Sequence, residues 1–244
     1  MIWARLGQLG AVVALGALGA ACSSSDAGGK ATDTSPPPTT VLTTENFGMQ
    51  HSGDGTFYAT ADGSGACGYD KTADVHIAAL NSTDWADSAW CGACADVTGP
   101  NGNLVRVRIV DECPDCTPGQ LDLHPDAFAE LAPQTEGRIK ISWTFVACDA
   151  VGPVKYKFKD GSNPYWTAVQ VRNSRYPISK FESSKDGSTW KELQLQKFAY
   201  FLTDTGFGPG TTQVRITAEN GTTLSDTLPE VQASLEVPGQ AQFQ

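Results

Sequence analysis

Short alternations of hydrophobic and polar residues run through most of the chain after residue 46 and predict β-strands separated by Gly, Asn and Asp turns. In the first part they cover residues 104–110, 120–123 and 138–146, with further strands predicted at 55–60 and 90–97. Residues 75–80 fit either a strand or a helix. Pro125 is typical of the first turn of a helix, where its missing N–H is not needed. Six further strands follow, at residues 154–159, 166–172, 178–183, 190–195, 199–202 and 213–218. The pattern predicts an all-β protein.

Charge and cysteine content divide this β-rich part in two. Residues 46–149 hold 15 acidic and 5 basic residues, whereas residues 150–244 hold 9 and 10. Six cysteines lie in the first part and none in the second. A short Gly-Pro stretch at 150–153 lies between them, so we predict domains at 46–149 and 153–244. The acidity of the first domain argues against a nucleic-acid partner.

The N-terminal 45 residues predict an exported protein. An apolar run at residues 9–21 is too short to span a bilayer and is typical of a signal peptide, here residues 1–22, followed by a Ser/Thr/Pro linker at 23–45. Small residues before Cys22 resemble a bacterial lipoprotein processing site. Two outcomes stay open: a cell-surface lipoprotein whose only membrane contact is a lipid on Cys22, or a cleaved, secreted extracellular product.

The other cysteines allow two interpretations. An even number of cysteines in an exported chain predicts disulfides, although the sequence does not decide their pairing. Two C-x-x-C pairs also match the spacing of a zinc ribbon, but export and two additional cysteines favour disulfides. The six are Cys67, Cys91, Cys94, Cys113, Cys116 and Cys148. The three histidines lie far apart, and we expect neither a metal nor a cofactor.

Two acids and three aromatics are candidates for carbohydrate chemistry. Asp111 follows the strand at 104–110, and Asp122 lies between two leucines of the next strand. A pair of carboxyl groups flanking a sugar bond is the apparatus of glycoside hydrolysis. Alternatively, Asp111 caps a turn and Asp122 faces solvent. Tyr165, Trp166 and Phe198 could stack on pyranose rings, or they could belong to a β-sandwich core.

Several runs together resemble a bacterial expansin. They are GTFY at 55–58, VDECP at 110–114, LDL at 121–123, AF at 127–128, YWTAVQVRN at 165–173 and YP at 176–177. The resemblance covers about residues 46–243. It implies a six-stranded double-psi β-barrel, related to family-45 endoglucanases, followed by an immunoglobulin-like domain of the family-63 cellulose-binding type. It also implies loosening of plant-type walls without hydrolysis.

The resemblance also implies roles for individual residues. Asp122 matches the acid required for loosening, and Asp111 and Thr56 match residues that line the same groove. Tyr165, Trp166 and Phe198 match aromatics that stack on cellulose, with Lys159 at a basic position nearby. The implied disulfides are Cys67–Cys91, Cys94–Cys148 and Cys113–Cys116.

One departure from the related endoglucanases bears on function. Those enzymes keep a second aspartate just after a Thr-x-Tyr strand, whereas residues 56–60 carry no carboxylate and the nearest is Asp62. An acid without a base performs inverting hydrolysis poorly. The sequence therefore favours a monomeric, non-hydrolytic protein that binds cellulose and associated glucans such as xyloglucan. The alternatives are a weak endoglucanase, a lytic transglycosylase that uses Asp122 alone on peptidoglycan, and a passive cellulose-adhesion lipoprotein.

Overall fold

The computed structural model describes residues 47–244, which belong to one compact unit. The predictions for the signal peptide, the linker and Cys22 lie outside the described residues. Within residues 47–244, no helix has the length and apolar character needed to cross a membrane.

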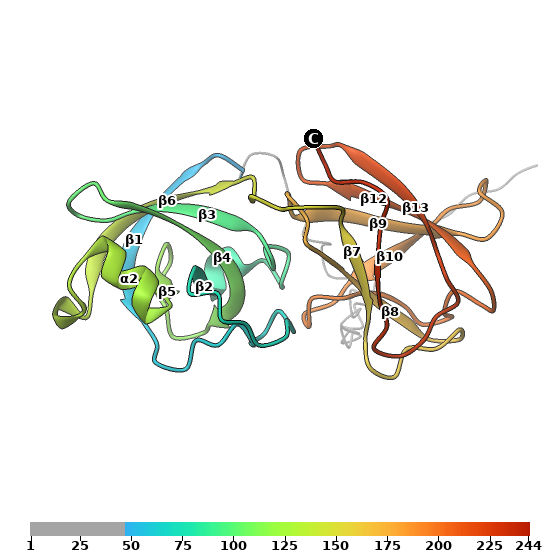
Figure 1. The fold of residues 1–244 in the computed structure, drawn as a ribbon, viewed down its shortest axis with the longest axis horizontal. Helices are drawn as coiled ribbons and strands as arrows, with labels where there is room; N and C mark the ends of the chain where they lie inside the picture. The colour runs from blue at the N-terminus through green and yellow to red at the C-terminus, as the bar shows by residue number, and fades with distance from the viewer. Residues whose placement is uncertain (1–46) are drawn as a thin grey trace, which may run out of the picture. The chain divides into compact units, whose positions relative to one another are not determined.

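Six strands of the first part close into a barrel (Figure 1). Around the barrel the order is β1-β5-β2-β4-β3-β6. β1 pairs with β5, and β2 with β4, in parallel; the other neighbours are antiparallel. The strands are β1 (Gln50–Phe57), β2 (Ile77–Asn81), β3 (Cys94–Thr98), β4 (Leu104–Cys113), β5 (Leu121–Leu123) and β6 (Ile139–Val146). The barrel and the predicted all-β class are therefore confirmed.

Aromatic packing and two short helices complete the barrel. Trp90 stacks on Phe145 inside it, with ring centroids 3.9 Å apart. α1 (Ser82–Trp85) follows β2, and α2 (Pro125–Leu131) follows β5. As expected for Pro125, α2 begins there, and the His124 side chain caps it by accepting a hydrogen bond from the Asp126 N–H at 3.1 Å. α2 buries Phe128 against Phe57.

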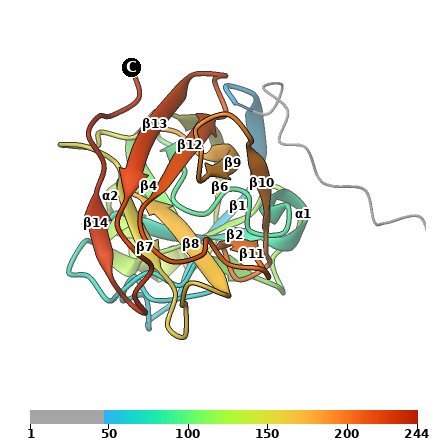
Figure 2. The same cartoon turned by 90° about the vertical axis from the view of Figure 1, so that its right-hand side faces the viewer.

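The remaining strands form one folded sheet, in the order β13-β12-β9-β10-β11-β8-β7-β14. β10 pairs with both β9 and β11, so it belongs to both halves of the sheet. Tyr156 of β7 and Phe181 of β9 meet edge to face at 6.2 Å, which shows that the halves pack against each other (Figure 2). The strands are β7 (Lys155–Phe158), β8 (Thr167–Arg172), β9 (Ile178–Ser184), β10 (Lys191–Leu195), β11 (Phe201–Thr203), β12 (Thr212–Ala218), β13 (Thr223–Leu228) and β14 (Glu236–Pro238).

Some sequence expectations need correction. The ambiguous residues at 75–80 contribute to β2, which is buried along its whole length and so lacks the polar face that would have identified it. The strand expected at 90–97 begins only at Cys94, because residues before it form a turn in which Gly92 has φ +81°. β13 and β14 were not predicted. β13 is rich in Thr, Ser and Asp, and its buried Asp226 accepts a hydrogen bond from Tyr156 at 2.7 Å.

The cysteines pair as the resemblance implies. Cys67 bonds to Cys91, Cys94 to Cys148 and Cys113 to Cys116. All four cysteines of the alternative zinc-ribbon spacing are therefore disulfide-bonded. Two of the bridges tie segments that are distant in sequence, and the third closes a short loop beside Asp111.

One buried carboxyl group makes stability depend on pH. Glu219, directly after β12, is 2% exposed, and neither of its oxygens has a hydrogen-bond partner within residues 47–244. Burial raises the pKa of Glu219 from 4.5 to about 7. A folded-state pKa above the unfolded one means that the native state loses stability as pH rises from about 4.5 to about 7.

Glu219→Gln is therefore expected to raise Tm at pH 8 and to have little effect at pH 4, where the wild-type carboxyl is already protonated. The gain at pH 8 should be on the order of 1 kcal/mol. Thermal melts across this pH range measure it. The control is Glu136→Gln at an exposed glutamate. A gain that is the same at both pH values would contradict the assignment.

Candidate functional site

The site begins with a row of residues across four neighbouring strands of the barrel. The strand registers pair Thr56 of β1 with Asp122 of β5, Asp122 with Ala79 of β2, and Ala79 with Asp111 of β4. Two interstrand steps separate the two acids, which is about 10 Å between backbones. Three predicted groove residues that are far apart in sequence therefore lie side by side.

A β-bulge decides which way Asp111 faces. Along β4 the buried positions Val105, Val107 and Ile109 alternate with more exposed ones, so strict alternation would turn Asp111 into the core. Against β2, however, Ile109 and Asp111 pair with consecutive residues, and Val110 becomes the extra residue. The bulge buries Val110 and leaves Asp111 partly exposed.

Asp122 is held by the neighbouring threonine. Its position between the buried Leu121 and Leu123 points the carboxylate away from the core. The Thr56 hydroxyl donates to Asp122 Oδ1 at 2.5 Å, and it accepts from the Gln120 amide at 3.1 Å. Burial raises the pKa of Asp122, while the Thr56 hydrogen bond and the positive charge of Arg138 oppose the rise.

Asp111 is covered by residues 65–66. Its Oδ1 accepts from the Ala66 N–H at 2.6 Å and from the Glu112 N–H at 2.9 Å. Gly65 permits this approach, because a Cβ there would lie 2.4 Å from the Asp111 carboxyl carbon. Asp111 is thus bound to a loop, which agrees with the capping alternative and also leaves its second oxygen available.

Tyr165 and Trp166 belong to a tight turn that precedes β8. Asn163 and Trp166 pair through N–H···O bonds of 2.8 and 3.2 Å, and the Asn163 side chain accepts from the Tyr165 N–H at 2.9 Å. Tyr165 is 71% exposed and Trp166 is half-buried. The alternative that these rings belong to the sandwich core is therefore wrong for Tyr165. The Trp166 indole is only partly buried.

Phe198 lies in a second turn, between β10 and β11. Gln196 and Tyr200 pair through their backbones, and Ala199 takes a left-handed conformation with φ +62°. Phe198 is 38% exposed. Because β11 pairs with β8 in antiparallel orientation and each turn precedes its strand, this turn and the Tyr165–Trp166 turn lie at opposite ends of the strand pair. We call the two turns the aromatic turns.

Comparison with known proteins gives the family. No protein-family model matches the chain. Expansin-YoaJ of Bacillus subtilis (strain 168) is 35% identical over 200 residues, which span 76% of this chain and 85% of that protein. The chain belongs to the expansin family. Expansin-like protein 3 of Dictyostelium discoideum is 32% identical over 199 residues, spanning 77% of this chain and 59% of the relative.

Solved expansins have the same fold as this one. The crystal structure of apo Clavibacter michiganensis expansin matches with a TM-score of 0.74 and 29% identity, covering 80% of this chain and 98% of that one. A mutant of the Clavibacter expansin, solved in complex with cellohexaose, matches with the same values. The recognition of an expansin from its sequence runs is thereby confirmed.

Asp62, the nearest substitute for a missing base in this expansin, is already engaged. Its carboxylate contacts Lys71 Nζ at 2.7 Å and accepts from the Ser64 N–H at 3.1 Å. The Lys71 contact and the Ser64 hydrogen bonds lower the pKa of Asp62 to about 2. A carboxylate with so low a pKa is a weak proton acceptor.

The sequence analysis did not single out Tyr58, although it noted the Thr-x-Tyr strand. The Tyr58 hydroxyl oxygen is buried and has no hydrogen-bond partner within residues 47–244. Burial raises the pKa of Tyr58, and the negative charges of Asp111, Asp122 and Asp62 raise it further. This phenol therefore keeps its proton, and it is a free donor close to three acids.

Gln120 was missed as well, because nothing in sequence marks a glutamine before a strand as functional. Its Oε1 accepts from the Thr117 N–H and hydroxyl at 3.2 Å each and from Arg138 at 3.4 Å. These donors orient the amide so that its nitrogen faces Thr56. The single proton of the Thr56 hydroxyl is then directed to Asp122, and a proton on Asp122 belongs on Oδ2.

Lys159 lies beside one of the aromatic turns of this expansin. Its Nζ is 5.6 Å from the ring centres of both Phe198 and Tyr200. Those two rings are 6.2 Å apart. A cation over aromatic faces of this kind holds the rings and keeps a hydrogen-bond donor close to any ligand stacked on Phe198.

Proposed function

We propose that this expansin binds cellulose through its aromatic turns and loosens glucan networks without hydrolysing them. The observation that carries the proposal is the state of the carboxyl groups beside Thr56. Asp122 has a raised pKa and a directed hydrogen bond, whereas Asp62 is ion-paired and has a pKa of about 2. Hydrolysis by inversion requires a second group that activates water.

The groove would then act by hydrogen bonding. Asp122 Oδ2 offers an acceptor of fixed position, which suits a hydroxyl group of a sugar ring. A glucan chain gripped there would no longer hydrogen-bond to its neighbours in the wall. The Clavibacter expansin complex with cellohexaose supports a β-linked glucan as ligand.

Exposed aromatics support cellulose as the binding partner of the second domain. A flat sugar surface presents C–H groups that stack on aromatic faces. Tyr165, Trp166 and Phe198 are accessible for this on the two aromatic turns, which lie at opposite ends of the antiparallel β8–β11 pair, with Lys159 next to Phe198. Xyloglucan, as a glucan associated with cellulose, is the second polymer that we propose.

Weak endoglucanase activity is the second candidate, because Asp111 lies two strands from Asp122. Their backbone separation of about 10 Å is close to the roughly 6.5–9.5 Å between the carboxyl groups of inverting glycosidases. Two N–H donors occupy one oxygen of Asp111 and tie it to the loop at residues 65–66, so this side chain already serves as a turn cap. This favours the non-hydrolytic proposal over the enzyme.

We also propose export, with the domains at 46–149 and 153–244 acting at a wall as a monomer. The expansin family and the N-terminal sequence pattern support export. Cys22 carries either a lipid, which would keep the protein at the cell surface, or no lipid, in a secreted form. Mass spectrometry of the mature N-terminus separates these two forms.

The decisive experiment incubates the pure protein with cellulose paper and with a cellulose–xyloglucan composite, and measures soluble sugar and tensile strength on the same samples. We expect a loss of strength with no reducing sugar above the buffer control. Sugar release that grows with time and disappears in Asp111→Asn would select the endoglucanase. In a parallel incubation with peptidoglycan, release of anhydro-sugars would select the lytic transglycosylase. Binding without weakening would leave only adhesion.

A further inference from the structure

Gln170 of β8 joins two segments that the proposed function keeps apart. Its side chain is buried, and its amide nitrogen donates to the Cys67 carbonyl at 2.7 Å and to the Ala199 carbonyl at 3.0 Å. Cys67 belongs to the loop of the barrel that covers Asp111, and Ala199 follows Phe198 in an aromatic turn. One amide group thus uses both of its protons to connect the two.

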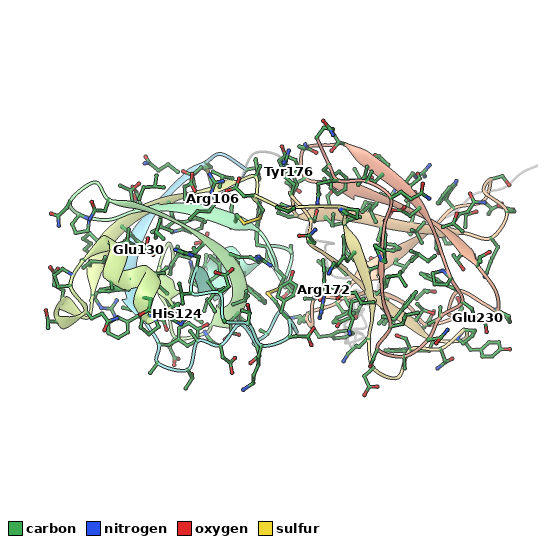
Figure 3. The ribbon with its side chains drawn as sticks, viewed as in Figure 1. Arg106, His124, Glu130, Arg172, Tyr176 and Glu230 are labelled. Carbon is green, nitrogen blue, oxygen red and sulfur yellow. A yellow bond between two sulfur atoms is a disulfide. The ribbon has the colours of Figure 1, made fainter. Side chains whose placement is uncertain are left out.

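Arg172 of β8, which Figure 3 labels, hydrogen-bonds to that amide and fixes its orientation. Its Nε donates to Gln170 Oε1 at 2.8 Å, so the nitrogen of Gln170 must face the two carbonyls. The same guanidinium donates to the Gly68 carbonyl at 2.9 Å and to the Asp70 carboxylate at 2.6 Å. Arg172 therefore ties residues 68 and 70 to β8, as Gln170 ties Cys67.

The loop continues directly to the groove acid. Residues 65–70 start at Gly65, which touches the Asp111 carboxyl, and the Ala66 N–H donates to that carboxyl at 2.6 Å. The Cys67 N–H donates to the Val110 carbonyl at 3.2 Å. A shift of Cys67 would therefore move both the residue before Asp111 and the donor to its side chain.

The turn that carries Phe198 contacts the loop at residues 65–70. A Cβ on Gly68 would lie 3.5 Å from the Tyr200 ring, so the two segments are in near contact at this glycine. Tyr200 in turn packs beside Phe198. The chain of contacts from the exposed ring of Phe198 to the carboxyl of Asp111 is continuous through Ala199, Gln170, Cys67 and Ala66.

We propose that Gln170, oriented by Arg172, is a positioning residue that couples the Phe198 turn to Asp111, so that docking of the aromatic turns on a glucan surface sets the position of the groove acid. The inference rests on the proposed function and assigns to β8 a task beyond carrying aromatics. Neither Gln170 nor Arg172 touches the glucan in this scheme. They act through the loop at 65–70.

The test uses Gln170→Ala in the whole protein. Loss of two buried hydrogen bonds should reduce paper weakening about fivefold or more, with cellulose binding within about twofold of wild type. Gln194→Ala, an exposed glutamine in the same sheet, is the matched control and should match wild type. Should Gln170→Ala fail to fold, Arg172→Lys is the second variant, because it keeps the charge but loses the planar guanidinium. It should likewise reduce paper weakening and leave cellulose binding nearly unchanged.

A double-mutant cycle separates positioning from general loosening of the fold. If Gln170 acts through Asp111, then Gln170→Ala should add almost nothing to the loss of weakening in an Asp111→Asn background. Losses that multiply would show that Gln170 acts independently of Asp111, and the inference would be wrong.

Hydrogen exchange tests the coupling without any wall assay. In Gln170→Ala, the Ala66 amide, which is bonded to Asp111 rather than to Gln170, should exchange faster together with the amides of residues 197–200. Unchanged exchange at Ala66 would overturn the inference even if the protein weakens paper. If Ala66 and residues 197–200 exchange faster together in Gln170→Ala, but the wild-type protein fails to weaken paper, then the proposed function alone would be rejected.

Discussion

Asp122→Asn is expected to abolish the weakening of cellulose paper and to leave cellulose binding unchanged. Asn has the shape of Asp and keeps an oxygen for the Thr56 hydroxyl, whose hydrogen bond to Asp122 is 2.5 Å long. It loses the negative charge and the ability to exchange a proton. Hydrogen bonds to a charged group contribute about 1.5–3 kcal/mol each, so a loss of at least about 10-fold is expected.

The measurement pairs tensile loss of paper with a depletion assay for cellulose binding. Asp126→Asn, at an exposed aspartate in the first turn of α2, is the control and should behave as wild type. Since burial raises the pKa of Asp122, the neutral side chain should not destabilise the fold, and melting curves check this. Normal weakening by Asp122→Asn would remove Asp122 from the proposed groove.

Trp166→Ala is expected to act on the opposite step, by weakening attachment to cellulose. The indole is accessible on a turn fixed by backbone bonds between Asn163 and Trp166. Loss of one stacked ring should reduce affinity about 2- to 12-fold, corresponding to roughly 0.5–1.5 kcal/mol. Tyr165→Ala and Phe198→Ala should each do the same, and the triple variant should bind almost no cellulose.

Trp190→Ala is the matched control for Trp166→Ala. Trp190, directly before β10, is also half-buried, but its ring contacts Arg215 at 4.4 Å rather than an aromatic turn. Because the groove is intact in Trp166→Ala, a higher protein concentration should restore weakening. Equal losses of binding and weakening in both the Asp122 and the Trp166 variants would contradict a division of labour between groove and turns.

Strands, helix starts and motifs that depend on neighbouring residues were predictable from the sequence, because their signals are local. The alternation along 104–110 and Pro125 gave a strand and a helix, and the run at 165–173 identified the family. The N-terminal pattern gave the prediction of export, on which the described residues do not bear. The carboxylate-free stretch after Thr56 gave the hypothesis of a non-hydrolytic groove.

The position of each groove residue depended on contacts between distant segments. A one-residue bulge against β2 turns Asp111 from the core to the surface, and parallel pairing of β1 with β5 places Thr56 opposite Asp122. The sequence carries no local sign of Gln170 as a bridge or of Glu219 as a buried acid. The chain alone determined most of its elements, its family and its candidate acids. Only the tertiary structure decided register, burial and hydrogen-bond partners, because these arise between residues far apart in the chain.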